Sequence, residues 1–367
     1  MRVTNSMLTA NFLRDLGANT ERMAFYQTQM AQQKKITRLS QDPVGVVSVL
    51  KSRAKLRDLA MYRENIQTSK DWLTQSETAA NDIEEVIKRM KELNIQGAND
   101  PNSDEARQSI AAEVKQLKEH LVTALNSTQT NKYLFSGYNV SETPFETTSI
   151  SKTYDSGTDK ERTVTFELLL FNGVPMHDVY DPESTTTPPA SLLPQFTGVL
   201  DPDTTAPYAS FADAQDQLNL MNPEPISYKI GFDLMMDVSV HGLDFIGTGD
   251  NNLFKIINDI ERMLSGERYE DTVAWNEELN PMIQKIDDAQ DRLLASIAEM
   301  GGKQNRLDLY ENRYSYDAIN YEEMRSNVED LDMAEASMHF MMAEAVYKAA
   351  LSVGSRVIQP TLLDFLR

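Results

Sequence analysis

The sequence predicts a mainly α-helical protein with a β-rich insertion, in which the N- and C-terminal segments pair as a long antiparallel coiled-coil rod. Three observations support this fold class. Both ends of the chain, residues 1–39 and 328–367, are long, proline-poor amphipathic stretches. Apolar residues recur every 3.5 positions over residues 59–90 and 279–328, which is the period of a coiled-coil seam. Between residues 139 and 227, Thr, Ser, Pro and Asp dominate, which favours strands and loops.

The first predicted helix covers residues 7–39 and carries only a weak apolar stripe. The stripe consists of Leu13, Leu16, Met23 and Met30, with Thr20 and Gln27 on the same side. A lone helix of this kind is marginal in water, so we expect it to need a partner helix. Ser40-Gln41-Asp42-Pro43 ends the pattern, because the residue before a proline disfavours the α-helical conformation.

Two further helices are predicted before the insertion. The first follows Pro43 and carries the seam from Leu59 to Met90. Asn99-Asp100-Pro101-Asn102 predicts a turn, after which Ser103 is placed to cap the next helix. Because the connection is short, we expect this helix to return antiparallel to the one before it.

The insertion contains one clear hairpin signal. Residues 163–171 are strand-like, and Asn172-Gly173 is a strong two-residue turn signal. A second strand-like stretch runs from Ile226 to Val240, and a helical pattern resumes at Asp250 or Asn251.

The longest seam covers residues 279–328 and would extend about 75 Å at 1.5 Å per residue. A helix of that length cannot be buried by a compact domain, so the seam predicts a rod. Gly301-Gly302 lies inside it and is expected to weaken or bend the helix there.

The last segment is rich in methionine and small residues, which allow close and adaptable helix packing. Its apolar positions are Met338, Met341, Met342, Ala345, Ala349 and Val353, and an apolar tail with Leu362, Leu363, Phe365 and Leu366 follows Pro360. This face is either an ordinary helix core or a partner surface. For a helix at a chain end, the same surface can serve both purposes.

Composition argues against several classes of function. The formal net charge of −21 argues against nucleic-acid binding and against adsorption to an anionic membrane, because both need clustered Lys and Arg. No apolar run approaches the roughly 20 residues of a transmembrane helix, and the N-terminus lacks the apolar region of a Sec signal peptide. The chain has no cysteine, which rules out disulfides and thiolate metal sites.

No catalytic motif stands out in the sequence. The four histidines, His120, His177, His241 and His339, lack the spacing of metal ligands. The phosphate-binding, dinucleotide-binding, serine-hydrolase and zinc-protease motifs are missing as well. We therefore expect a non-enzymatic protein with no cofactor and no metal.

Six short motifs, in order, resemble those of the flagellin superfamily, and more closely the hook-associated proteins at the hook–filament junction. They are Arg2-Val3-Thr4-Asn5-Ser6-Met7, Ile36-Thr37-Arg38-Leu39-Ser40-Gln41-Asp42-Pro43-Val44-Gly45, Tyr133-Leu134-Phe135-Ser136-Gly137, Gly302-Lys303-Gln304-Asn305-Arg306-Leu307, Val328-Glu329-Asp330-Leu331-Asp332-Met333-Ala334-Glu335 and Leu362-Leu363-Asp364-Phe365-Leu366. One departure is Gln41, which stands where many relatives have a first Asp of an Asp pair.

The resemblance implies three domains and a structural role in joining hook to filament. Residues 1–42 and 333–367 would form a terminal coiled-coil domain that lines an inner tube. Residues 43–150 and 228–332 would form a helical rod domain, and residues 151–227 a β-rich outer insertion. The predicted assembly interface consists of Leu13, Leu16, Met23, Met30, Met338, Met341, Met342, Ala345, Val353, Leu362, Leu363 and Phe365.

The resemblance also implies partners and a location. Copies of the chain would form a tubular ring between a neighbouring hook-associated protein and flagellin. An export chaperone would hold the C-terminal helix before the chain leaves the cell unfolded, through the flagellar type III channel and without a cleaved signal peptide. The chain would then reside in the extracellular flagellum.

Two alternatives remain open. The nearer one is flagellin itself, the subunit of the filament. The other is a secreted adhesin or hydrolase that uses residues 151–227 to bind or cut a ligand.

Overall fold

The computed structural model describes residues 5–98, 103–137, 139–154, 162–180, 191–196, 199–201, 207–208, 210–220, 225–265 and 272–357. The chain divides into two compact units. Unit 1 consists of Met1–Met61 and Asn312–Arg367, and unit 2 of Tyr62–Glu311. The division of the chain into three domains stays a prediction.

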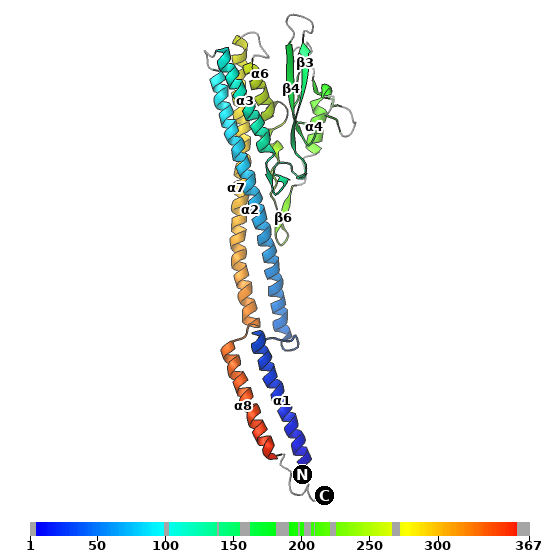
Figure 1. The fold of residues 1–367 in the computed structure, drawn as a ribbon, viewed down its shortest axis with the longest axis vertical. Coiled ribbons are helices and arrows are strands. Elements are labelled where there is room, and N and C mark those ends of the chain that lie inside the picture. Colours follow the sequence, from blue (N-terminus) through cyan, green and yellow to red (C-terminus); the bar gives the residue numbers. More distant parts are fainter. Residues whose placement is uncertain are drawn as a thin grey trace. The chain divides into compact units, whose positions relative to one another are not determined.

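Helices make up most of the described chain (Figure 1). They are α1 (Asn5–Gln32), α2 (Pro43–Ala98), α3 (Asp104–Leu125), α4 (Phe211–Leu220), α5 (Gly242–Ile246), α6 (Leu253–Ser265), α7 (Thr272–Glu329) and α8 (Met333–Val357). The strands are β1 (Thr128–Gln129), β2 (Lys132–Tyr133), β3 (Phe145–Tyr154), β4 (Arg162–Phe171), β5 (Val174–Pro175), β6 (Ser227–Gly231) and β7 (Leu234–Asp237). This mainly helical fold with a small antiparallel insertion confirms the predicted fold class.

In unit 1, α1 and α8 lie side by side (Figure 1). The first helix ends at Gln32 and not at residue 39 as predicted. Gln33 ends it, since its φ of 54° lies in the left-handed region. Lys34 then pairs with Asp330 in an antiparallel bridge, which joins the end of α1 to the start of α8.

In unit 2, the predicted seams form the core. The seam residues of α2 that are buried include Tyr62, Ile66, Leu73, Ala80, Ile83, Ile87 and Met90. Those of α7 include Leu279, Ile286, Leu293, Met300 and Leu307. Ion pairs accompany the apolar contact, because Lys70 on α2 lies 2.7 Å from Asp308 and 2.9 Å from Glu311 on α7.

The cap and hairpin predictions are confirmed. The Ser103 hydroxyl accepts a hydrogen bond from the Ala106 backbone N–H at 3.2 Å, which caps α3. Asn172 and Gly173 both have positive φ, 49° and 83°, and join β4 to β5 with Phe171 opposite Val174. These are the dihedral signs that a type I′ turn requires.

One prediction about the middle of the chain needs correction. The stretch predicted as β-rich contains the helix α4, whose Ala214 and Leu218 are buried one turn apart. The helix α7 includes Gly301 and Gly302, and the local weakening or bending expected there stays a prediction. An added Cβ would meet no atom within 4 Å at either glycine, so packing does not require glycine there.

The β-sheet of the insertion is antiparallel, in the order β3-β4-β5. β3 pairs with β4 along its whole length, from Phe145 opposite Phe171 to Tyr154 opposite Arg162. The predicted start of the insertion at residue 151 therefore lies inside β3. The predicted loops at residues 185–189 and 201–207 fall almost entirely outside the described residues.

No helix among the described residues is long and apolar enough to span a membrane. The described part of the chain also holds no group of three or more His, Cys, Asp or Glu side chains placed to bind a metal ion.

Candidate functional site

The α1–α8 pair in unit 1 has an inner seam of half-buried side chains. On α1 these positions follow spacings of three and four and are Thr9, Phe12, Leu16, Asn19, Met23, Tyr26 and Met30. On α8 the inner positions are Ala336, Phe340, Ala343, Tyr347, Ala350 and Gly354. The inner seam of α8 therefore combines four small residues with the aromatic residues Phe340 and Tyr347.

Two contacts fix the antiparallel register of the pair. The Phe12 ring lies so close to Gly354 that an added Cβ would be 2.1 Å from the Phe12 Cζ atom. At the other end, the Tyr26 and His339 rings stack with centroids 5.5 Å apart and planes 13° apart. Residues near the start of α1 thus meet residues near the end of α8.

The predicted assembly residues fall into three groups in the single chain. Leu16, Met23 and Met30 lie on the inner seam and are half-buried. Leu13, Met338, Met341, Met342, Ala345 and Val353 are exposed, with Leu13 56% and Met341 62% exposed. Leu362, Leu363 and Phe365 lie outside the described residues. Phe12, Tyr26 and the alanine seam of α8 were not predicted, although the spacing from Leu16 and Met23 could have located the two aromatics.

The helix α8 is apolar on both of its sides. Its inner seam meets α1, whereas Met338, Met342 and Val353 project from the other side and are about half exposed or more. A helix that is apolar all round is normally buried all round. Within the single chain, one apolar side of α8 is therefore exposed, although an apolar side is normally buried.

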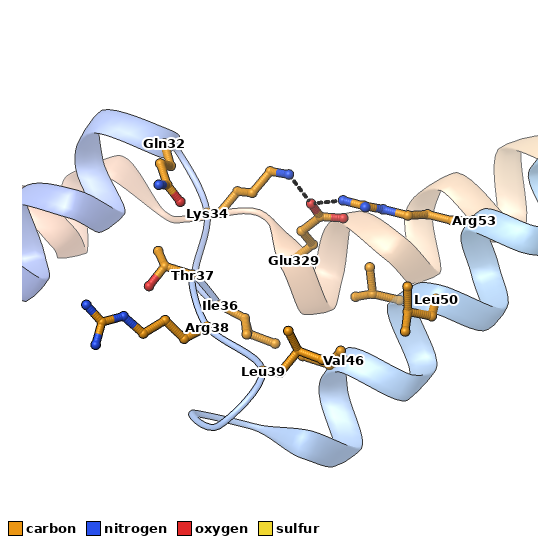
Figure 2. Close-up of a pocket in the computed structure, with 11 residues that line it drawn as sticks. Gln32, Lys34, Ile36, Thr37, Arg38, Leu39, Val46, Leu50, Arg53 and Glu329 are labelled. Carbon is orange, nitrogen blue, oxygen red and sulfur yellow. Dashed lines mark hydrogen bonds and ion pairs between the residues drawn. The ribbon is translucent and has the colours of Figure 1, made fainter.

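In unit 1, Glu329 at the end of α7 contacts both the loop after α1 and the first turns of α2. Its buried carboxylate lies 2.6 Å from the Lys34 ammonium and forms a second ion pair with the Arg53 guanidinium (Figure 2). Burial alone raises the pKa of Glu329, but the hydrogen bonds and charges of Lys34 and Arg53 outweigh burial, and the net pKa is lowered. The Lys35 N–H also donates to the Glu329 carbonyl at 2.8 Å.

Next to Glu329, the loop between α1 and α2 encloses a pocket of about 290 Å³. Figure 2 shows Ile36, Leu39, Val46 and Leu50 gathered on one side of it, with Lys34, Arg38 and Arg53 also in its lining. The pocket thus combines an apolar wall with three basic side chains, and two of these, Lys34 and Arg53, are paired with Glu329 in the same lining.

The loop that builds this pocket contains the family-like motif at residues 36–45. Asp42 caps α2 by accepting from the Gly45 N–H at 2.9 Å. A side chain at position 45 would displace the Asp42 carboxylate from this cap, since an added Cβ would lie 2.3 Å from the Asp42 Oδ2 atom. The Gln41 Oε1 atom accepts from the Thr37 and Arg38 backbone N–H groups at 2.9 and 3.1 Å, so an amide oxygen holds the loop here.

The buried histidine of unit 2 is held by backbone groups and not by catalytic partners. The His177 Nε2 atom accepts from the Leu169 N–H at 3.3 Å, which leaves Nδ1 to donate to the Asp178 carbonyl at 3.1 Å. Burial lowers the pKa of His177 to about 4, so the ring is neutral at physiological pH. Ser191 donates to the Asp178 carboxylate at 2.6 Å, away from the imidazole nitrogens.

Comparison with protein families matches both ends of the chain. Residues 3–140 match the bacterial flagellin N-terminal helical region, and residues 283–366 match the bacterial flagellin C-terminal helical region. Together these matches cover more than half of the chain, and they include both helices of the α1–α8 pair.

Individual relatives point to the same group of proteins. The chain is 26% identical to flagellin of Clostridium tyrobutyricum over 131 residues, which is 36% of this chain and 35% of that protein. It is 24% identical to flagellar hook-associated protein 3 of Escherichia coli over 147 residues, 40% of this chain and 46% of that protein. The chain spans about a third to a half of the length of several curated relatives that it matches.

The fold also resembles a solved structure. A flagellar hook-associated protein from Vibrio parahaemolyticus superposes with a TM-score of 0.54 at 17% identity, over 79% of this chain and 100% of that chain. At this identity the likeness concerns the fold. All of these similarities are to flagellar proteins. Because the helical regions at both ends match those of flagellin and the fold agrees, the chain belongs to the flagellin family of flagellar structural proteins.

Proposed function

We propose that the chain is the subunit that joins hook to filament in the bacterial flagellum, and that it assembles through its terminal helices. One observation carries the assembly step: α8 is apolar on two sides, and α1 covers only one of them. Neighbouring copies in a tubular array would cover Met338, Met341 and Met342. Each contact in the array would be heterologous, which means that it joins two different surfaces of neighbouring copies. Contacts of this head-to-tail kind generate rings and helices.

The choice of the junction over the filament rests on the motifs at the two ends and on the fold. The Vibrio parahaemolyticus structure, all of which aligns with this chain at a TM-score of 0.54, carries the name of a hook-associated protein, as does the Escherichia coli relative. The neighbours of the ring would be another hook-associated protein on one side and flagellin on the other.

The weakness of the α1–α8 seam also supports export before assembly. Among the described side chains of α1, only Gln29 is buried. Such a pair gains little apolar burial to offset the entropy of ordering two helices. We propose that both ends order fully only in the array, and that a chaperone holds α8 until the chain leaves through the flagellar export channel.

Deleting the gene and imaging the cells tests the junction role. The expected result is hooks without filaments, together with full-length flagellin shed into the medium. A plasmid copy of the gene should restore filaments. If the deletion instead removes the major filament protein itself, with no flagellin in the medium, the chain is the filament subunit.

That second candidate function, flagellin, is favoured by the match to the Clostridium tyrobutyricum protein. Purified chain tests it directly. A filament subunit should elongate filament seeds into long filaments, whereas a junction subunit should add only a short layer.

A further inference from the structure

In unit 1, basic residues gather in the loop before α2 and at its start, whereas acidic residues gather at the end of α7 and just after it. Residues 34–57 contain seven Lys and Arg and one acidic residue, in a chain whose net charge is −21. Residues 317–335 contain the reverse, seven Asp and Glu and one Arg. The first stretch includes the start of α2 and the second the end of α7.

The outer side of α2 combines basic and apolar side chains. Seam residues such as Val49 and Leu59 are buried, and positions two residues away face the opposite side because each residue turns the helix by about 100°. These positions are Val47, Lys51 and Arg57, and all three are exposed. Lys51 and Arg57 have no ion-pair partner in the part of the chain that the structure describes, unlike Arg53, which turns inward to Glu329.

The outer side of α7 combines acidic and apolar side chains. Tyr314 is buried and Tyr321 half-buried on the inner side. Two residues from them lie Tyr316, Ile319 and Glu323, which are exposed, Tyr316 by 71% and Ile319 by 60%. Across the described residues Glu323 has no ion-pair partner.

The inner sides of the two helices face each other, since Arg53 of α2 pairs with Glu329 of α7. The two outer sides therefore lie on opposite sides of the pair. One outer side is basic and the other acidic, and both carry exposed apolar groups. The outer side of α2 is therefore complementary to the outer side of α7, whereas two α2 surfaces would repel each other. A contact between such different surfaces is heterologous and repeats from copy to copy.

We propose that the outer side of α2 in one copy binds the outer side of α7 in the next copy. The occupant is a second copy of this chain because its own α7 supplies the complementary charge beside matching apolar side chains. Opposite charges at this contact would also offset the repulsion between copies that each carry a net charge of −21. The proposal rests on the proposed function only in that copies assemble around an axis.

Cysteine cross-linking tests the contact, since the chain has no native cysteine. One cysteine replaces Lys51 or Arg57, and a second replaces Ile319 or Glu323, in the full-length chain. Flagella carrying each of the four double variants are isolated and treated with a short bis-maleimide. The expected result is a ladder of dimers, trimers and larger products in at least one double variant, with only monomer in each single variant.

Two outcomes would overturn the proposal. One is the failure of all four double variants to cross-link in flagella that contain the chain. The other is dimer formation by a single variant alone, which would indicate a two-fold contact of like surfaces. Because cross-linking reports contact between copies wherever they assemble, it is independent of whether the gene deletion places the chain at the junction or in the filament.

Charge reversal provides a second test that does not depend on register. Glu322, the exposed neighbour of Glu323 on α7, forms an ion pair with Arg325 of the same helix. Lys51→Glu with Arg57→Glu, or Glu322→Lys with Glu323→Lys, should each lower the amount of chain in isolated flagella at least tenfold. All four changes together should restore most of it, because each copy then carries both reversed surfaces. The control, Lys115→Glu with Lys132→Glu, makes the same charge change at exposed positions of unit 2 and should assemble normally. Failure of the fourfold variant to assemble, with a normal unfolding midpoint, would refute the complementarity.

Discussion

The Phe12 ring occupies the space where a side chain at Gly354 would begin, with the Phe12 Cζ atom 2.1 Å from the position of an ideal Cβ. The two helices therefore approach closely at this point, and the absence of a side chain at Gly354 leaves room for the Phe12 ring.

Gly354→Ala is therefore expected to weaken the α1–α8 pair, even though alanine favours an isolated helix by roughly 1 kcal/mol over glycine. The added methyl group must displace the Phe12 ring. The measurement is the fraction of chain found in isolated flagella relative to the medium. Gly17→Ala on α1 is the matched control, since an added Cβ there meets nothing within 4 Å, and it should assemble at least as well as the native chain. Equal assembly of both variants would contradict the role of this contact.

Hydrogen exchange on the free monomer is expected to separate the chain into two regions. Amides of residues 5–32 should exchange quickly, because that helix has little buried apolar area to hold it in place. Amides of α2 and α7 in unit 2 should exchange slowly, since Ile66, Leu73 and Leu293 are fully buried there. Strong protection across residues 5–35 would contradict ordering upon assembly.

The sequence predicted the interior of unit 2 better than the surfaces of unit 1, for a physical reason. In α2 one apolar stripe meets one partner, so the 3.5-residue period identifies the core from Leu59 to Met90. In α8 two stripes compete, and hydrophobicity alone favours Met338 and Met342 over Ala343 and Ala350. The closer helix contact uses the small residues, and only the partner's position reveals this.

The secondary structure in the middle of the chain was harder to predict. The local composition there indicates where turns lie, but it does not indicate which strands and helices pack together. Asn172-Gly173 gave a reliable hairpin, since its backbone conformation is determined locally. The helix α4 was missed because its ten residues, Phe211–Leu220, contribute only two fully buried side chains, Ala214 and Leu218. Its packing partners come from distant parts of the sequence.

Glu329→Gln is expected to destabilise unit 1 by roughly 1–2 kcal/mol at pH 7, since it leaves Lys34 and Arg53 without their shared carboxylate. Because the pKa of Glu329 is lowered in the folded protein, its contribution to the stability of unit 1 is fully present above the ordinary glutamate pKa of about 4.3. It is lost as the pH falls through the lowered native value. Hydrogen exchange of residues 44–60 is measured in the native chain and in Glu329→Gln, at pH 7 and near pH 3. The variant should exchange faster than the native chain at pH 7, and the difference should vanish near pH 3.

Glu323→Gln is the control for that experiment, because Glu323 lies on the same helix, is exposed and lacks an ion-pair partner within the described chain. It should leave protection of residues 44–60 unchanged in the monomer. Equal effects of the two variants would mean that Glu329 acts through net charge and not through its ion pairs.

His177 is expected to make unit 2 less stable in acid. Its native pKa of about 4 lies below the ordinary value of 6.5, so the unfolded chain binds the extra proton more readily between these values. Its contribution is therefore complete above pH 6.5 and is lost as the pH falls towards 4, with a total of about 3 kcal/mol. Denaturant unfolding of the native chain and of His177→Gln should give a stability difference that shrinks over this range. The raised pKa of Asp178 acts in the opposite direction, but it is present in both proteins and largely cancels in their difference.

Met338→Asp with Met342→Asp is expected to abolish assembly without unfolding the chain. Both side chains are exposed in the single chain, 53% and 51%, so charges there meet water and cost little in the monomer. In the array the same positions would lie against a neighbouring copy, where an unpaired buried carboxylate is strongly unfavourable. Circular dichroism should show a native unfolding midpoint, while isolated flagella should lack the chain. Met235→Asp provides the matched control, because Met235 is 55% exposed on β7 in unit 2 and lies outside the proposed surface. If filaments still attach to hooks in the double variant, the outer side of α8 is not an assembly surface, and its exposed methionines have no role in assembly.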